Sequence, residues 1–176
     1  MATKSTIHKA LLNIANMDTH YYAEHNLTLA KHPSESDLRL MVRLLAFTLN
    51  ANDDLQFCKG IAEDDEPDIW QKNLGGDIDL WIDLGQPDEK RIKKACGRSK
   101  EVIIYTYQKG AAEAWLKQIE KMLKRFNNLN IVHLNIEGDI EAISSRSMGL
   151  QANISDGQLD LICDENSVVV TEDTLY

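Results

Sequence analysis

Apolar residues recur along this chain with two periods, which predicts a mixture of strands and helices. Alternate positions are apolar in a half-buried strand, and positions three and four apart are apolar in a helix. The predicted strands span residues 6–17, 20–31, 55–59, 77–84, 102–107, 130–136, 150–154, 159–163 and 168–170. The predicted helices span residues 34–50, 110–126 and, as a short helix, 138–146, and a further helix is entered through Pro87-Asp88. The predicted fold class is therefore α+β.

Composition and charge narrow the picture to an ordinary globular protein. The 176 residues, 43% apolar and 27% charged, fit a single domain over residues 1–176. The formal net charge of −9 argues against broad attraction to nucleic acid or to anionic membranes, so polyanion binding would have to be local. The three cysteines form no C-x-x-C pair, which argues against a structural zinc site. No signal-peptide core and no membrane-spanning run is visible, which predicts a cytoplasmic protein.

The helix at residues 34–50 is predicted to begin beside several polar side chains. Ser34 is a good N-cap, and Glu35 suits the positive end of the helix dipole. His32 precedes them and could orient Glu35 or a phosphate, although a histidine at a helix entry is more often a structural residue. The apolar stripe from Leu38 to Leu49 is so wide that the helix is predicted to be buried on most sides.

Acidic and apolar residues alternate strictly from Asp77 to Leu84, which predicts a strand with its carboxylates on one face. Asp79 and Asp83 share that face. They would lie about 13 Å apart along a straight strand. Oxygen ligands of magnesium lie only about 2.1 Å from the ion, so these two acids are too far apart to share it.

A hairpin offers Asp83 a nearer acidic partner. If Gly75-Gly76 forms a two-residue loop, Trp70 lies opposite Trp81 and Asp68 lies opposite Asp83. Directly opposed residues have Cβ atoms about 5 Å apart, close enough for both carboxylates to bind one cation. The alternative is that these acids are only the solvated face of an edge hairpin.

Six cationic residues follow between Lys90 and Lys100. Helical geometry places Arg91 and Lys93 at the margins of the apolar stripe, from which they can lean toward the sheet. Lys90 and Lys94 point outward, although the Lys94 stem is long enough to bend back. This basic run is either a phosphate-binding flank for the acids or an ordinary solvated face.

Four segments carry a resemblance to a known family: "LTLAKHPSES", "EDDEPDIW", "DLWIDLGQPDEKRIKKAC" and "MGLQANISDG". They resemble the YaeQ family of small bacterial proteins, and the similarity extends over nearly the whole chain. Members of that family have a fold similar to the restriction-endonuclease-like core of the PD-(D/E)xK superfamily. The resemblance therefore implies a mixed central sheet flanked by helices in αβββαβ order, with additional strands at both termini.

The resemblance also implies where acids of a metal site would lie. The acidic residue on the first core helix of the superfamily is matched by Glu35. Its Pro-Asp pair is matched by Pro67-Asp68, with Asp79 as a second candidate, and its next acid is matched by Asp83. At the position of the motif lysine this chain has Gly85, which can neither position water nor offset phosphate charge.

Some members of the superfamily supply the missing cation from the following helix, which here implies Arg91, Lys93 or Lys94. One hypothesis is therefore a nuclease dependent on Mg²⁺ or Mn²⁺, which contacts nucleic acid through the Lys90–Lys100 run. In this hypothesis Glu35 and Asp83, with either Asp68 or Asp79, hold one or two metal ions, and the site is lined by His32 and Ser34. The competing hypothesis is a non-catalytic adaptor that keeps the fold and binds nucleic acid or protein. The missing lysine and the net charge favour the adaptor.

Overall fold

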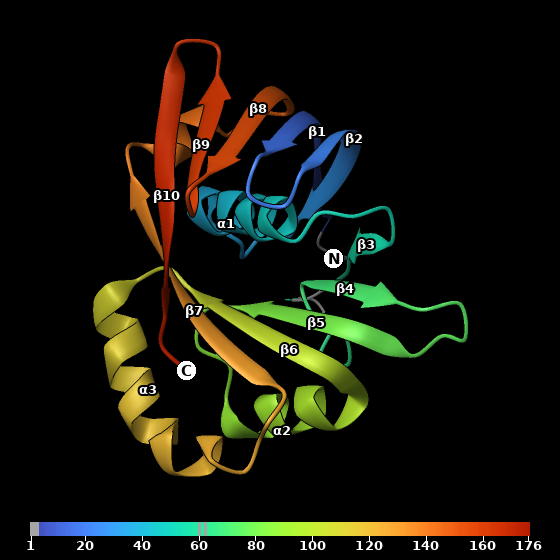
Figure 1. Ribbon diagram of the computed structural model, residues 1–176, viewed down its shortest axis with the longest axis vertical. Coiled ribbons are helices and arrows are strands. Elements are labelled where there is room, and N and C mark those ends of the chain that lie inside the picture. The colour runs from blue at the N-terminus through green and yellow to red at the C-terminus, as the bar shows by residue number, and fades with distance from the viewer. Residues whose placement is uncertain (1–3, 60, 62) are drawn as a thin grey trace. The chain divides into compact units, whose positions relative to one another are not determined.

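Figure 1 shows the computed structural model, which describes residues 4–59, 61 and 63–176. Ten strands and three α-helices occur in the described part of the chain, which confirms the α+β class. These residues form two compact units. The first comprises the described residues of Met1–Thr48 together with Asn135–Glu172, and the second comprises Leu49–Leu134 together with Asp173–Tyr176. The single domain expected over residues 1–176 stays a prediction.

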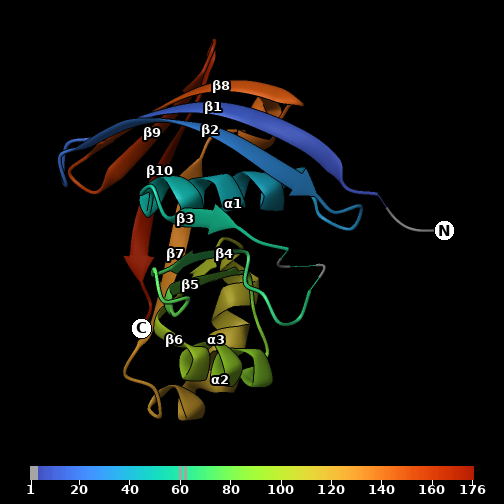
Figure 2. The same ribbon diagram turned by 90° about the vertical axis from the view of Figure 1, so that its right-hand side faces the viewer.

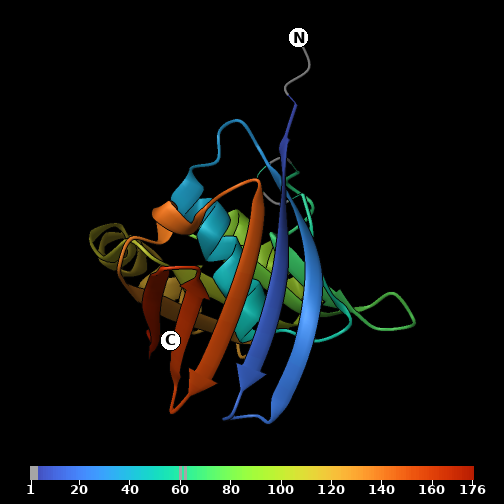
Figure 3. The same cartoon turned by 90° about the horizontal axis from the view of Figure 1, so that it is seen from above.

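The first unit is a sheet with one long helix against it. In the sheet, β1 pairs antiparallel with β2 and parallel with β8, in the order β2-β1-β8-β9-β10. Helix α1 lies along one face of these strands (Figures 2 and 3). The elements are β1 (Thr6–Asn16), β2 (Tyr21–Lys31), α1 (Asp37–Leu49), the 3-10 helix η2 (Ile140–Ile143), β8 (Ser147–Ser155), β9 (Gln158–Cys163) and β10 (Asn166–Thr174).

Helix α1 is buried along most of its length but begins later than the sequence predicted. Every residue from Leu40 to Thr48 is buried, as the wide apolar stripe indicated. The predicted N-cap at Ser34 is wrong, because the Ser34 hydroxyl is hydrogen-bonded to His32 Nδ1 at 2.6 Å. Ser36 caps the helix instead, and its Oγ accepts a hydrogen bond from the Arg39 N–H at 3.1 Å.

The second unit is a mixed sheet in the order β7-β6-β5-β4-β3. Strands β3, β4 and β5 pair antiparallel, and β5, β6 and β7 pair parallel. Helices α2 and α3 lie on the same side of these strands (Figure 2). The elements are β3 (Leu55–Phe57), β4 (Ile69–Lys72), β5 (Ile78–Leu84), α2 (Glu89–Arg98), β6 (Ser99–Thr106), α3 (Lys109–Leu123) and β7 (Leu129–Glu137).

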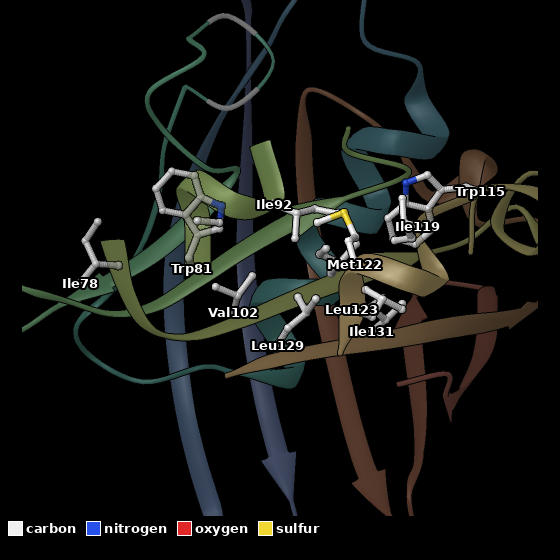
Figure 4. Close-up of a cluster of buried hydrophobic side chains, with 12 residues drawn as sticks. Ile78, Trp81, Ile92, Val102, Trp115, Ile119, Met122, Leu123, Leu129 and Ile131 are labelled. Carbon is white, nitrogen blue, oxygen red and sulfur yellow. The ribbon is translucent and has the colours of Figure 1, made fainter. Parts of the chain in front are cut away.

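The core of the second unit lies between its sheet and the helices α2 and α3 (Figure 4). Trp81 on β5 is fully buried there, beside Ile92 of α2. Trp115 of α3 is buried too, and its indole N–H donates a hydrogen bond to the Pro87 carbonyl at 2.8 Å. This bond ties α3 to the connection before α2, the helix that carries the basic run.

Candidate functional site

Strand β5 buries Asp83 rather than exposing it. The strand lies between β4 and β6, so it is not at the edge of the sheet. Only 3% of Asp83 is exposed, and the interpretation of this acid as part of a solvated edge hairpin is wrong. Asp79 is half-buried and forms an ion pair with Lys100 at 2.9 Å.

The hairpin of β4 and β5 has the predicted register near Asp83. Trp70 lies opposite Trp81, and Ile69 lies opposite Ile82. Asp68 directly precedes this paired segment, and its N–H donates to the Ile82 carbonyl at 3.1 Å. Only 2% of Asp68 is exposed. The structure therefore places two buried carboxylates in the β4–β5 hairpin region, that of Asp68 directly before β4 and that of Asp83 on β5.

The turn of the hairpin differs from the prediction. A bulge between Gln71 and Lys72 shifts the pairing, so the two-residue loop predicted at Gly75-Gly76 is wrong. Asn73 closes the turn, because its side-chain oxygen accepts hydrogen bonds from the N–H groups of Gly75 and Asp77. An asparagine side chain commonly bonds its own backbone in this way. The bulge absorbs the extra residue, which is why the register near Asp83 is unaffected.

Asp83 is held by three donors on its two oxygens. Arg91, in the first turns of α2, donates from Nε to Oδ2 and from Nη2 to Oδ1, each at 2.9 Å. The Trp81 indole donates to Oδ2, also at 2.9 Å. Asp88 positions Arg91, because the Asp88 carboxylate caps α2 by accepting from the Arg91 N–H at 2.8 Å.

Arg91 is therefore firmly charged at this place. Burial lowers the pKa of its guanidinium. The hydrogen bonds and charge of Asp83, together with the charges of Asp68 and Asp64, raise this pKa by more than burial lowers it. The pKa of Arg91 consequently lies above its usual value. The Asp68 carboxylate is itself held by β5, because its Oδ2 accepts a hydrogen bond from the Leu84 N–H at 3.1 Å.

The other cations of the basic run do not all behave as predicted. Lys93 does not lean toward the sheet but pairs with Glu89 on its own helix at 3.2 Å, and both side chains are about half exposed. Lys94 bends to reach Asp65 at 2.6 Å. Lys90, Arg91 and Lys94 also line a polar cavity of about 280 Å³ with Asp64 and Asp88.

A short acidic segment, Glu63–Glu66, contacts these cations, and sequence reasoning missed the contact. Arg91 and Arg98 donate to its carbonyl groups, and Lys94 pairs with its Asp65 carboxylate. The available signal was the match between four successive acids and cations spaced three and four apart on the next helix. Below, this segment is called the acidic strap.

Glu35 lies in the first unit, where two arginines hold it. It precedes α1 and is only 4% exposed, so its predicted place in the first turn of the helix is wrong. Its carboxylate accepts from Arg39 Nη1 at 2.7 Å and from Arg43 Nη2 at 2.8 Å. His32 and Ser34 bond one another nearby in sequence. A shared metal site of Glu35 with Asp83 stays a prediction.

No three His, Cys, Asp or Glu side chains are grouped closely enough to hold a metal ion within residues 4–59, 61 and 63–176. Asp68 and Asp83 are thus a pair of acids rather than a complete ligand set. The same described residues include no helix of the length and hydropathy needed to cross a membrane.

Comparison with known proteins identifies the family. A model of the YaeQ protein family matches residues 1–172. The chain belongs to the YaeQ family. It is 45% identical over 172 residues to the uncharacterised protein YaeQ of Escherichia coli (strain K12), and the match covers 97% of this chain and 95% of that protein. It is 42% identical over 173 residues to the uncharacterised protein YaeQ of Salmonella typhi, with the same coverage.

Solved structures of YaeQ proteins have a similar fold. The crystal structure of YaeQ from Xanthomonas axonopodis pv. citri has a TM-score of 0.90 at 45% identity, covering 97% of this chain and 98% of that chain. YaeQ from Pseudomonas syringae has a TM-score of 0.89 at 28% identity, covering 98% of this chain and 96% of that chain. None of these names states an activity.

Proposed function

We propose that this YaeQ protein is a metal-dependent phosphodiester hydrolase that acts on nucleic acid and has a restriction-endonuclease-like core. The observation that carries the proposal is the position of Arg91. Arg91, on the helix α2 that follows β5, lies against Asp83. Asp83 is two residues before the position at which the superfamily motif has its lysine, and this chain has no lysine there. Gly85 occupies that position with a φ of 86°, and nothing lies within 4 Å of the place where its Cβ would be.

The order of elements supports the same core. Along the chain α1, β3, β4, β5, α2 and β6 follow one another, which is the αβββαβ order of the PD-(D/E)xK superfamily. Pro67-Asp68 precedes β4, and Asp83 lies at the end of β5. Asp68, rather than Asp79, is therefore the second acid in the proposal, because Asp79 is engaged by Lys100 further along the strand.

Each of the three side chains has a role in the proposed reaction. Asp68 and Asp83 would hold Mg²⁺ or Mn²⁺, hard cations that prefer carboxylate oxygens. When bound, the metal would lower the pKa of a coordinated water and stabilise the charge that develops on the phosphate. Arg91 would offset that charge, with its planar guanidinium suited to two phosphate oxygens.

The contacts of Asp83 leave limited room for a metal. An ionised carboxylate offers about four acceptor positions, and three donors already reach this one. One acceptor position therefore remains for a metal ion, and coordination through both oxygens would require at least one Arg91 hydrogen bond to be released. A guanidinium N–H released in this way could bind a substrate phosphate, which would couple bidentate metal binding to substrate binding in the proposal.

A non-catalytic adaptor is the second candidate, and the pairing of the cations favours it. Lys93, Lys94 and Lys100 each have an acidic partner within the chain. Arg91 and Asp83 form a closed, bidentate ion pair. A chain of this kind could keep the nuclease-like fold for binding alone.

Manganese titration and nucleic-acid cleavage separate the two candidates. Isothermal titration with Mn²⁺ is compared for the wild type, Asp83→Asn, Asp68→Asn and the control Asp79→Asn, with an oligonucleotide present. We expect one binding event that is lost in the first two variants and kept in the control. Cleavage of labelled DNA or RNA should fall about a hundredfold in Arg91→Met, the usual loss when one charge-stabilising donor is removed.

Two results would contradict the hydrolase. One is cleavage that persists unchanged in Asp83→Asn. The other is a wild type that neither binds Mn²⁺ nor cleaves DNA or RNA, which leaves the adaptor.

A further inference from the structure

The acidic strap, Glu63–Glu66, is fastened to α2 by four hydrogen bonds from three cations. Arg91 donates from Nη2 to the Glu66 carbonyl at 2.8 Å and from Nη1 to the Asp64 carbonyl at 3.3 Å. Lys94 Nζ donates to the Asp65 carboxylate at 2.6 Å. Arg98 Nη1 donates to the Asp65 carbonyl at 2.7 Å. The strap thus supplies oxygen acceptors to three of the six cations of the basic run.

The three cations form a stripe along one face of α2. They are spaced by three and four residues, so their side chains lie above one another on the helix. From Arg91 to Arg98 the helix rises about 10 Å. A row of cationic donors of this length can contact successive phosphates of a nucleic-acid strand, because phosphate oxygens accept the same hydrogen bonds as carboxylates and carbonyls.

The Asp65–Lys94 contact of the strap is charged, so it competes with phosphates for Lys94, but it is also exposed, so phosphates can displace it. The hydrogen bond from Lys94 lowers the pKa of Asp65, so this carboxylate stays charged at neutral pH. However, the Asp65 side chain is 81% exposed and that of Lys94 is 34% exposed, and exposed ion pairs contribute little stability. A polyanion that offers several phosphates at once can replace such contacts.

We propose that the acidic strap is a built-in competitor, which covers a surface of α2 that binds the phosphodiester backbone of single-stranded nucleic acid. The nucleic-acid strand binds as the acidic strap leaves α2. The phosphates of the nucleic acid then accept hydrogen bonds from Lys94 and Arg98. This resolves how a chain with net charge −9 can present a local site for a polyanion. The inference rests on the nucleic-acid partner of the proposed function but not on its metal or its chemistry.

The test measures binding in EDTA, where metal-dependent cleavage is absent. Fluorescence anisotropy with labelled single-stranded DNA and RNA oligonucleotides compares the wild type with Asp64→Asn/Asp65→Asn. The matched control is Glu113→Gln/Glu120→Gln, which removes two exposed charges from α3. We expect the strap variant to bind about fivefold more tightly, as loss of the Lys94–Asp65 ion pair and of a second negative charge on the strap implies, and the control to stay within about twofold of the wild type.

A second variant tests the other side of the contact. Lys94→Gln/Arg98→Gln should bind more weakly, and its dependence of log Kd on log salt should be less steep by about 1.4, the value for two lost phosphate contacts on a single strand. Far-UV circular dichroism checks that each variant is folded.

Three outcomes overturn the proposal. They are equal affinities of the strap variant and the control, no weakening in Lys94→Gln/Arg98→Gln, and no binding of either oligonucleotide by the wild type and the strap variant. Failure of the proposed hydrolase is a different result, since it appears only in the assays with Mn²⁺ and in cleavage.

Discussion

Removal of Arg91 is expected to destabilise the protein far more than removal of a neighbouring cation. In Arg91→Met the buried carboxylate of Asp83 loses two of its three donors, while the one from Trp81 remains. Loss of one partner from a buried ion pair costs about 3–5 kcal/mol. The Arg91 side chain is 22% exposed, so water can reach part of the gap, and we expect a loss of about 3 kcal/mol.

The matched control is Lys93→Met, on the same helix. It removes the same charge, but the pair of Lys93 with Glu89 is half exposed and should contribute about 0.5 kcal/mol or less. Urea unfolding followed by circular dichroism gives the free energy of unfolding of each variant. In a double-mutant cycle, Arg91→Met with Asp83→Asn should cost about 2 kcal/mol less than the sum of the single variants.

A difference of less than about 1 kcal/mol between the unfolding free energies of Arg91→Met and Lys93→Met would contradict the role of Arg91 as the partner of a buried charge. That result would mean that water reaches Asp83 freely despite its burial. Additive costs in the double-mutant cycle would likewise show that Arg91 and Asp83 do not act as a pair.

Three other predictions concern single residues. Ser36→Ala should lower the free energy of unfolding by about 1 kcal/mol through loss of the α1 cap, while Ser34→Ala has less effect; equal losses in urea unfolding would contradict this cap. Gly138→Ala should destabilise more than Gly85→Ala in the same assay, since both have positive φ but only Gly138 would set a Cβ 3.0 Å from a neighbouring side chain. Burial, with the nearby charge of Glu66, raises the pKa of Cys58 from 9.0 to about 12, so its thiolate is about a thousandfold rarer at pH 8; alkylation of Cys58 by iodoacetamide, followed by mass spectrometry, should be slow when folded and fast when unfolded.

The parts of the fold that depend on local patterns could be predicted from the sequence. The period of two in β1 and β2 and the wide apolar stripe of α1 are properties of single segments. The pairing of Trp70 with Trp81 was also predictable, because a hairpin joins neighbouring segments. The angle of Arg91 on the helix predicted its position against the sheet, although the same argument was wrong for Lys93, which pairs with Glu89.

The misses arose where a distant or competing contact decided the structure. Alternation along β5 could not distinguish an edge strand from a central one, because the second neighbour, β6, follows only after α2. Two serines could cap α1, and the choice of Ser36 depended on the hydrogen bond of Ser34 with His32. The contact of the acidic strap with α2 was missed because the strap has no period of its own.

The parallel pairing of β1 with β8 has a consequence during synthesis. His8, near the start of β1, is hydrogen-bonded to Ser145, 137 residues later. At a translation rate of roughly 5–20 residues per second, this separation corresponds to a delay of roughly 7–27 s between the synthesis of the two residues. During that time one edge of β1 lacks its partner, and such edges promote aggregation. The nascent first unit is therefore open to aggregation through this edge until β8 emerges.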